Sequence, residues 1–125
     1  MTENQKTHLL VVDDEPEMRE ELFSFFADEG YRVTAVSSGN EGMEASLADP
    51  VDAVITDIRM PRGNGRELID HLQSNWPDLP ILVLTGHGAF DRKGVYQEKT
   101  SITVIRKPAG LREISRTLEQ MLGRG

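Results

Sequence analysis

The chain contains no cysteine, which excludes disulfides and thiolate metal sites and fits a reducing compartment. No apolar run approaches the roughly 20 residues that span a bilayer, and the polar first residues contain no signal-peptide core. Basic residues are also scarce: 14 Lys and Arg face 21 Asp and Glu, and the net charge of −7 has the wrong sign for holding a phosphate backbone. We therefore expect a soluble, cytoplasmic protein that binds neither membrane nor nucleic acid directly through this segment.

A single globular domain over residues 1–125 is expected, because the length and the 38% hydrophobic and 28% charged content fit one ordinary core. Four short runs rich in Val, Ile and Leu predict strands that are buried on both faces of a parallel sheet: residues 9–12, 53–56, 81–84 and 102–105. Residues 31–36 alternate polar and apolar side chains, which predicts an edge strand.

Segments of helical period lie between and after these strands and predict helices over residues 16–29, 40–48, 65–76 and 111–122. Pro16 lies in the first turn, where proline costs little, and Gly30 ends the first helix. Strands that alternate with helices at this spacing predict right-handed crossovers and a doubly wound α/β sheet. Residues 87–101, where the alternation requires a fourth helix, have no clear pattern, so a short or irregular helix is expected there.

Polar side chains stand where four of the predicted strands end: Asp13 and Asp14, then Asp57, Thr85 and Lys107. Ligands of open α/β sheets bind beyond the carboxyl ends of the strands. Carboxylates gathered in one crevice are unfavourable unless a cation balances them, and hard oxygen ligands suit Mg²⁺. An Asp in such a crevice can form an aspartyl phosphate when positive groups and hydroxyls stabilise the transferred oxygens.

Four motifs contain these residues and resemble those of bacterial response-regulator receiver domains, the CheY-like family of two-component signalling. They are VVDDE at 11–15, DIRMPRGNG at 57–65, LTG at 84–86 and KP at 107–108, in family order and with family-like separations. The resemblance covers essentially the whole chain. It implies a five-stranded parallel sheet of order 2-1-3-4-5 with helices on both faces, and a signalling switch that catalyses its own phosphorylation and dephosphorylation rather than a metabolic enzyme.

The resemblance also implies a phosphoryl acceptor and a metal site. Asp57 would accept the phosphoryl group from a sensor histidine kinase or phosphotransfer protein. Asp14 would ligate Mg²⁺ or Mn²⁺ directly, and Asp13 directly or through water. Asp57 and the backbone carbonyl of Arg59 would complete the set of protein ligands.

Further roles follow from the other matched positions. Thr85 would be the switch hydroxyl and Lys107 the cation that pairs with the phosphoryl group. The Lys107–Pro108 peptide would be cis, and Pro61, Gly65 and Pro108 would be structural.

Two residues beside the expected site are potentially cationic. Arg59 stands two positions after Asp57, and His87 two positions after Thr85. Our hypothesis is that they shield the phosphoryl group from water and lengthen its lifetime. An Arg59→Ala variant that loses phosphate no faster than wild type would count against it.

Some alternatives stay open. Asp14 could instead cap the first helix, and Asp57 could form a turn. Val104 and Ala109 stand where receivers often carry aromatics, so a rotating aromatic side chain cannot report phosphorylation from Val104. A pseudo-receiver that acts by binding alone, without phosphorylation, is the alternative function; the acidic site argues against it, and the unusual segment near Tyr96 keeps it open. The output partner or output domain is unknown, since the chain could be a complete regulator or the amino-terminal receiver of a longer transcription factor.

Overall fold

The computed structural model describes residues 6–58, 65–86 and 101–123, which alternate between strands and helices. The elements are β1 (His8–Val12), α1 (Pro16–Asp28), β2 (Arg32–Val36), α2 (Gly39–Ala48), β3 (Ala53–Asp57), α3 (Gly65–Asn75), β4 (Ile81–Thr85), β5 (Ile102–Arg106) and α4 (Leu111–Met121). Each predicted strand and helix is confirmed to within one residue at either end. The further helix expected within 87–101 lies, apart from Ser101, outside the described residues.

The five strands form one parallel sheet in the order β2-β1-β3-β4-β5, as predicted. β1 and β3 are neighbours, with Val12 opposite Thr56, and β3 pairs with β4 so that Asp57 lies opposite Leu84. The register aligns the carboxyl ends of the central strands. Residues that end or follow these strands are therefore brought together at one edge of the sheet.

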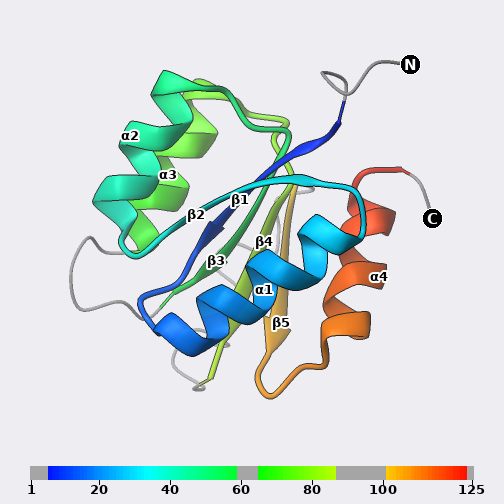
Figure 1. The fold of residues 1–125 in the computed structure, drawn as a ribbon. Helices are drawn as coiled ribbons and strands as arrows, with labels where there is room; N and C mark the ends of the chain where they lie inside the picture. The colour runs from blue at the N-terminus through cyan, green and yellow to red at the C-terminus, as the bar shows by residue number, and fades with distance from the viewer. Residues whose placement is uncertain (1–5, 59–64, 87–100, 124–125) are drawn as a thin grey trace.

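Two helical layers cover the sheet, with α2 and α3 on one face and α1 and α4 on the other (Figure 1). Successive side chains of a strand point to opposite faces. In β1, Leu10 and Val12 accordingly belong to the core on the α2 and α3 side, whereas Leu9 and Val11 belong to the core beneath α1 and α4. Burying each such aliphatic side chain stabilises the fold by about 1.5–3 kcal/mol.

Gly42 allows α2 to pack closely on the sheet. A Cβ atom at this position would lie 3.2 Å from Val12 Cγ2 and 3.3 Å from Leu68 Cδ1. Glycine normally weakens a helix interior, yet α2 continues through this position. The close approach brings the start of α2 beside the carboxyl end of β1.

Within residues 6–58, 65–86 and 101–123, every helix is too short or too polar to cross a membrane.

Candidate functional site

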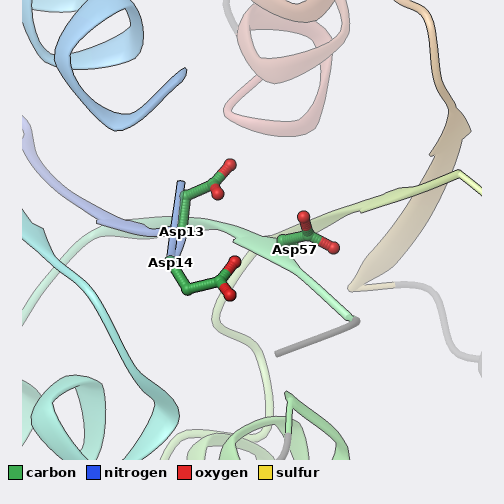
Figure 2. Close-up of side chains that lie close together, drawn as sticks. All are labelled: Asp13, Asp14 and Asp57. Atoms are coloured by element: carbon green, nitrogen blue, oxygen red, sulfur yellow. The ribbon is translucent and has the colours of Figure 1, made fainter. Parts of the chain in front are cut away.

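Three carboxylates gather at the carboxyl edge of the sheet (Figure 2). Asp13 and Asp14 follow β1, and Asp57 is the last residue of the neighbouring β3. Each offers a carboxylate oxygen, and the three oxygens lie within 4.8 Å of one another. Asp13 is 1% exposed and Asp57 6% exposed, while Asp14 is partly exposed. The predicted convergence of these side chains is confirmed.

The backbone and one carboxylate oxygen of Asp13 are held by three other residues. Its N–H donates to the Val36 carbonyl at 3.1 Å, and its Oδ1 accepts from the Glu15 N–H at 2.9 Å. Arg19 Nη1 donates to the Asp13 carbonyl oxygen at 3.0 Å. Asp13 Oδ2, by contrast, is buried and has no hydrogen-bond partner among the described residues.

The electrostatics around Asp13 favour a bound cation. Burial raises the pKa of the Asp13 carboxyl, the Glu15 N–H lowers it, and the charge of Asp57 raises it again. Buried polar atoms are nearly always paired, so an orphaned carboxylate oxygen beside two further carboxylates requires an explanation. A hard divalent cation would supply both the missing partner and the missing charge, and the set of oxygen donors fits one such as Mg²⁺.

Lys107 adds a positive charge to the same edge. Its Nζ donates to Asp57 Oδ2 at 2.7 Å, in an ion pair with a nearly buried carboxylate. Burial lowers the pKa of Lys107, but the hydrogen bond and charge of Asp57, with the charges of Asp13 and Glu15, outweigh burial and leave that pKa raised. Lys107 therefore remains an ammonium group at neutral pH.

Thr85 completes the set of predicted side chains at this edge. It is fully buried as the last residue of β4, and its carbonyl accepts from the Lys107 N–H at 2.7 Å. Asp57 and Thr85 were expected just after their strands, but both lie within them. The parallel ladder continues one residue further, with Thr85 opposite Arg106 in β5.

The remaining predictions for the site have different outcomes. The Lys107–Pro108 peptide is cis, as the resemblance implied, and Gly65 begins α3. The other predicted residues, Arg59, Pro61 and His87, lie outside the described residues.

Capping of α1 by Asp14 was an open alternative, and it is wrong. The residue at the N-cap position is Glu15, and the cap has no side-chain hydrogen bond. The carboxylate of Asp14 is therefore not used by the end of the helix, and it lies with those of Asp13 and Asp57 (Figure 2).

Sequence reasoning missed Arg19 and Val36, which hold the backbone of Asp13. Val36 belongs to the edge strand β2, and only the pairing of β1 with β2 shows that its carbonyl faces Asp13. Arg19 follows Glu15 by four positions, which places it one helical turn later. That spacing alone gives no indication of a backbone contact.

A family model of the response regulator receiver domain matches residues 9–119. The chain belongs to this family. It is a receiver domain of two-component systems, and the family works as signalling switches.

Similar proteins agree with this assignment. The response regulator MprA of Mycolicibacterium vanbaalenii is 34% identical over 116 residues, which are 93% of this chain and 50% of that protein. The transcriptional regulatory protein GlrR of Escherichia coli is 32% identical over 105 residues, which are 84% of this chain and 24% of GlrR. The receiver thus spans about a quarter to a half of the length of these curated relatives.

Solved structures share its fold. A response regulator receiver protein from Sinorhizobium medicae is 26% identical with a TM-score of 0.84, over 96% of this chain and 97% of that one. The response regulator TrrA of Thermotoga maritima, crystallised in complex with Mg²⁺ and BeF, is 27% identical with a TM-score of 0.81, over 92% and 98%.

Proposed function

We propose that this receiver accepts a phosphoryl group on Asp57 in an Mg²⁺-dependent reaction, and that phosphorylation switches its contacts with other proteins. The observation that carries the proposal is the carboxylate of Asp57, which pairs with the Lys107 ammonium at 2.7 Å and has an oxygen within 4.8 Å of carboxylate oxygens of Asp13 and Asp14. A nucleophilic carboxylate, a paired cation and a group of hard oxygen ligands are what phosphoryl transfer to an aspartate needs.

The transfer would proceed by direct displacement. A carboxylate oxygen of Asp57 attacks phosphorus, and the bond from phosphorus to the leaving group breaks. The leaving group is the imidazole nitrogen of a phosphohistidine, or acetate when acetyl phosphate is the donor. The Lys107 ammonium pairs with the oxygens of the transferred phosphoryl group, and the Thr85 hydroxyl donates a hydrogen bond to one of them. Slow attack by water on the aspartyl phosphate later resets the switch.

Asp13, Asp14 and Asp57 are the residues that would hold the metal ion. Bound Mg²⁺ neutralises the carboxylates and screens the incoming phosphoryl group. The unpartnered Oδ2 of Asp13 supports this assignment, as does the Mg²⁺ in the TrrA complex. The backbone carbonyl of Arg59 remains a predicted third contact, and shielding by Arg59 and His87 remains a hypothesis.

The proposal extends to the partners of the domain. A sensor histidine kinase or phosphotransfer protein in the cytoplasm would supply the phosphoryl group, and residues 1–125 would form one receiver domain. The output partner or output domain stays open, since the two curated relatives are about two and four times as long as the matched region.

Intact mass after incubation with acetyl phosphate and Mg²⁺ tests the proposal. Wild type should gain one phosphoryl group, and neither Asp57→Ala nor wild type in EDTA should gain any. Asp28→Ala, an exposed change at the end of α1, is the matched control and should behave as wild type. A wild-type protein that gains nothing, or one that reacts equally well in EDTA, would contradict the proposal.

A further inference from the structure

We infer that Arg19 is a positioning residue for the cation site, because its guanidinium fixes the backbone of Asp13 and so aims the free carboxylate oxygen at the metal. The inference rests on the proposed function, which assigns the metal to Asp13, Asp14 and Asp57. Arg19 Nη1 lies 3.0 Å from the Asp13 carbonyl oxygen.

Three of the four hydrogen-bonding atoms of Asp13 form hydrogen bonds with other residues, and one does not. Its N–H is held by the Val36 carbonyl, its carbonyl by Arg19, and its Oδ1 by the Glu15 N–H. Only Oδ2 is left, buried and without a hydrogen-bond partner among the described residues. Of the three contacts, only the one from Arg19 comes from a side chain, so substitution can remove it and leave the other two in place.

The helix carries Arg19 to this carbonyl for a geometric reason. Arg19 N–H donates to the Glu15 carbonyl at 2.9 Å, so Arg19 belongs to the first turns of α1. Long helical side chains lean back toward the helix N-terminus, and the loop between β1 and α1 lies in that direction. The guanidinium therefore connects α1 to Asp13, the residue that follows β1.

Arg19 also lies near the start of α2. Hydrogen bonds from the N–H and hydroxyl of Ser37, at 2.8 and 2.9 Å, lower the pKa of the Glu41 carboxyl, and the charge of Arg19 lowers it further. The acidic Glu41 thus lies near enough to add to the negative potential around the Arg19 guanidinium.

Whether cation affinity rises or falls when Arg19 is removed distinguishes a positioning role from a purely electrostatic one. Arg19 is positive, so if charge alone mattered, removing it should strengthen the binding of any cation. If Arg19 positions Asp13, removing it should weaken binding instead. The affinity for Mg²⁺ should fall more than the affinity for Ca²⁺, because Mg²⁺ demands near-ideal octahedral geometry whereas Ca²⁺ tolerates irregular sites.

The experiment measures cation affinity without any phosphoryl donor. The dissociation constants of Mg²⁺ and Ca²⁺ are obtained by calorimetric titration and from the rise in unfolding free energy with cation concentration. Wild type is compared with Arg19→Met, which keeps the stem, and with Arg19→Lys, which keeps the charge and one donor. Arg116 is an exposed arginine on α4, and Arg116→Met is the control for loss of one positive charge.

We expect Arg19→Met to weaken Mg²⁺ binding about tenfold, at the low end for a residue that orients a ligand, and to weaken Ca²⁺ binding less. Arg19→Lys should lie between wild type and Arg19→Met, and Arg116→Met should match wild type. If Arg19→Met is too unstable to titrate, Arg19→Lys decides alone, with an Mg²⁺ affinity equal to wild type counting against the inference.

Two results would overturn it. Equal or tighter Mg²⁺ binding by Arg19→Met, with wild type binding normally, refutes the role of Arg19 and leaves the proposed function intact. Wild type that binds no Mg²⁺ refutes the metal site itself, and the role of Arg19 with it.

Discussion

Replacing Asp13 with Asn should stabilise the metal-free protein. The side chain is 1% exposed, and its carboxylate has an oxygen within 4.8 Å of one from Asp57. Two unit charges at that separation repel by about 3.5 kcal/mol at an effective dielectric constant of about 20. Burial, the first cause of the raised pKa of Asp13, adds to the cost of its charged form.

Part of this repulsion is already offset in the wild type. Lys107 attracts both carboxylates, and the Glu15 N–H donates to Asp13 Oδ1. Asn keeps the shape and an acceptor for that N–H, and its amide NH₂ is far easier to bury than a charge. We therefore expect Asp13→Asn to raise the free energy of unfolding by about 1–2 kcal/mol in EDTA.

In saturating Mg²⁺ the order of stability should reverse, and wild type should be more stable than Asp13→Asn. Binding to the folded state stabilises by about 2.7 kcal/mol when the ligand is at about 100 times its dissociation constant. Asp13→Asn should lose most of this gain because it offers one carboxylate fewer. Urea unfolding in EDTA and in saturating Mg²⁺ measures both effects. A variant that is less stable than wild type in EDTA, or that gains as much from Mg²⁺, would refute the reasoning.

Three other substitutions test the packing and the ion pair by urea unfolding. Lys107→Met removes the ammonium that pairs with the nearly buried Asp57 carboxylate and should cost about 1–3 kcal/mol in EDTA; unchanged stability would show the 2.7 Å pair to be unimportant. Leu118→Ala, in the core beneath α1 and α4, should cost about 2–5 kcal/mol, and the exposed Gln120→Ala less than about 0.5 kcal/mol; equal losses would contradict the assigned faces of α4. Gly42→Val should cost about 1–3 kcal/mol, because its Cβ would lie 3.2 Å from the nearest side-chain carbon; a more stable variant would show that α2 can move away from the sheet.

The fold could be predicted because its central strands are short, continuous apolar runs separated by helical segments. Residues 53–56 and 81–84 are buried throughout, which only a sheet covered on both faces achieves. The predicted ends of β3 and β4, at residues 56 and 84, were each one residue too early, because the strands end at Asp57 and Thr85. A polar side chain looks like the end of a strand, but the parallel ladder depends on backbone atoms and continues through it.

The composition of the site was also predictable, but its supports were not. Four of the five strands are ended or followed by polar residues, so Asp13, Asp57 and Lys107 could be assigned without knowing any distance. The contacts from Arg19 and Val36 to Asp13 depend on how other elements pack. The contact of Tyr31 with Glu119 depends on packing in the same way, because it joins residues 88 positions apart. Local sequence patterns carry no information about such pairs.

Chemical trapping of the phosphorylated residue tests the central claim most directly. Borohydride reduces an aspartyl phosphate to homoserine, and peptide mass spectrometry after reaction with acetyl phosphate and Mg²⁺ identifies the position. The account predicts homoserine at position 57 alone, and none when Mg²⁺ is removed with EDTA. Homoserine at position 13 or 14, or none at all in a protein that binds Mg²⁺, would contradict the assignment of Asp57 as the phosphoryl acceptor.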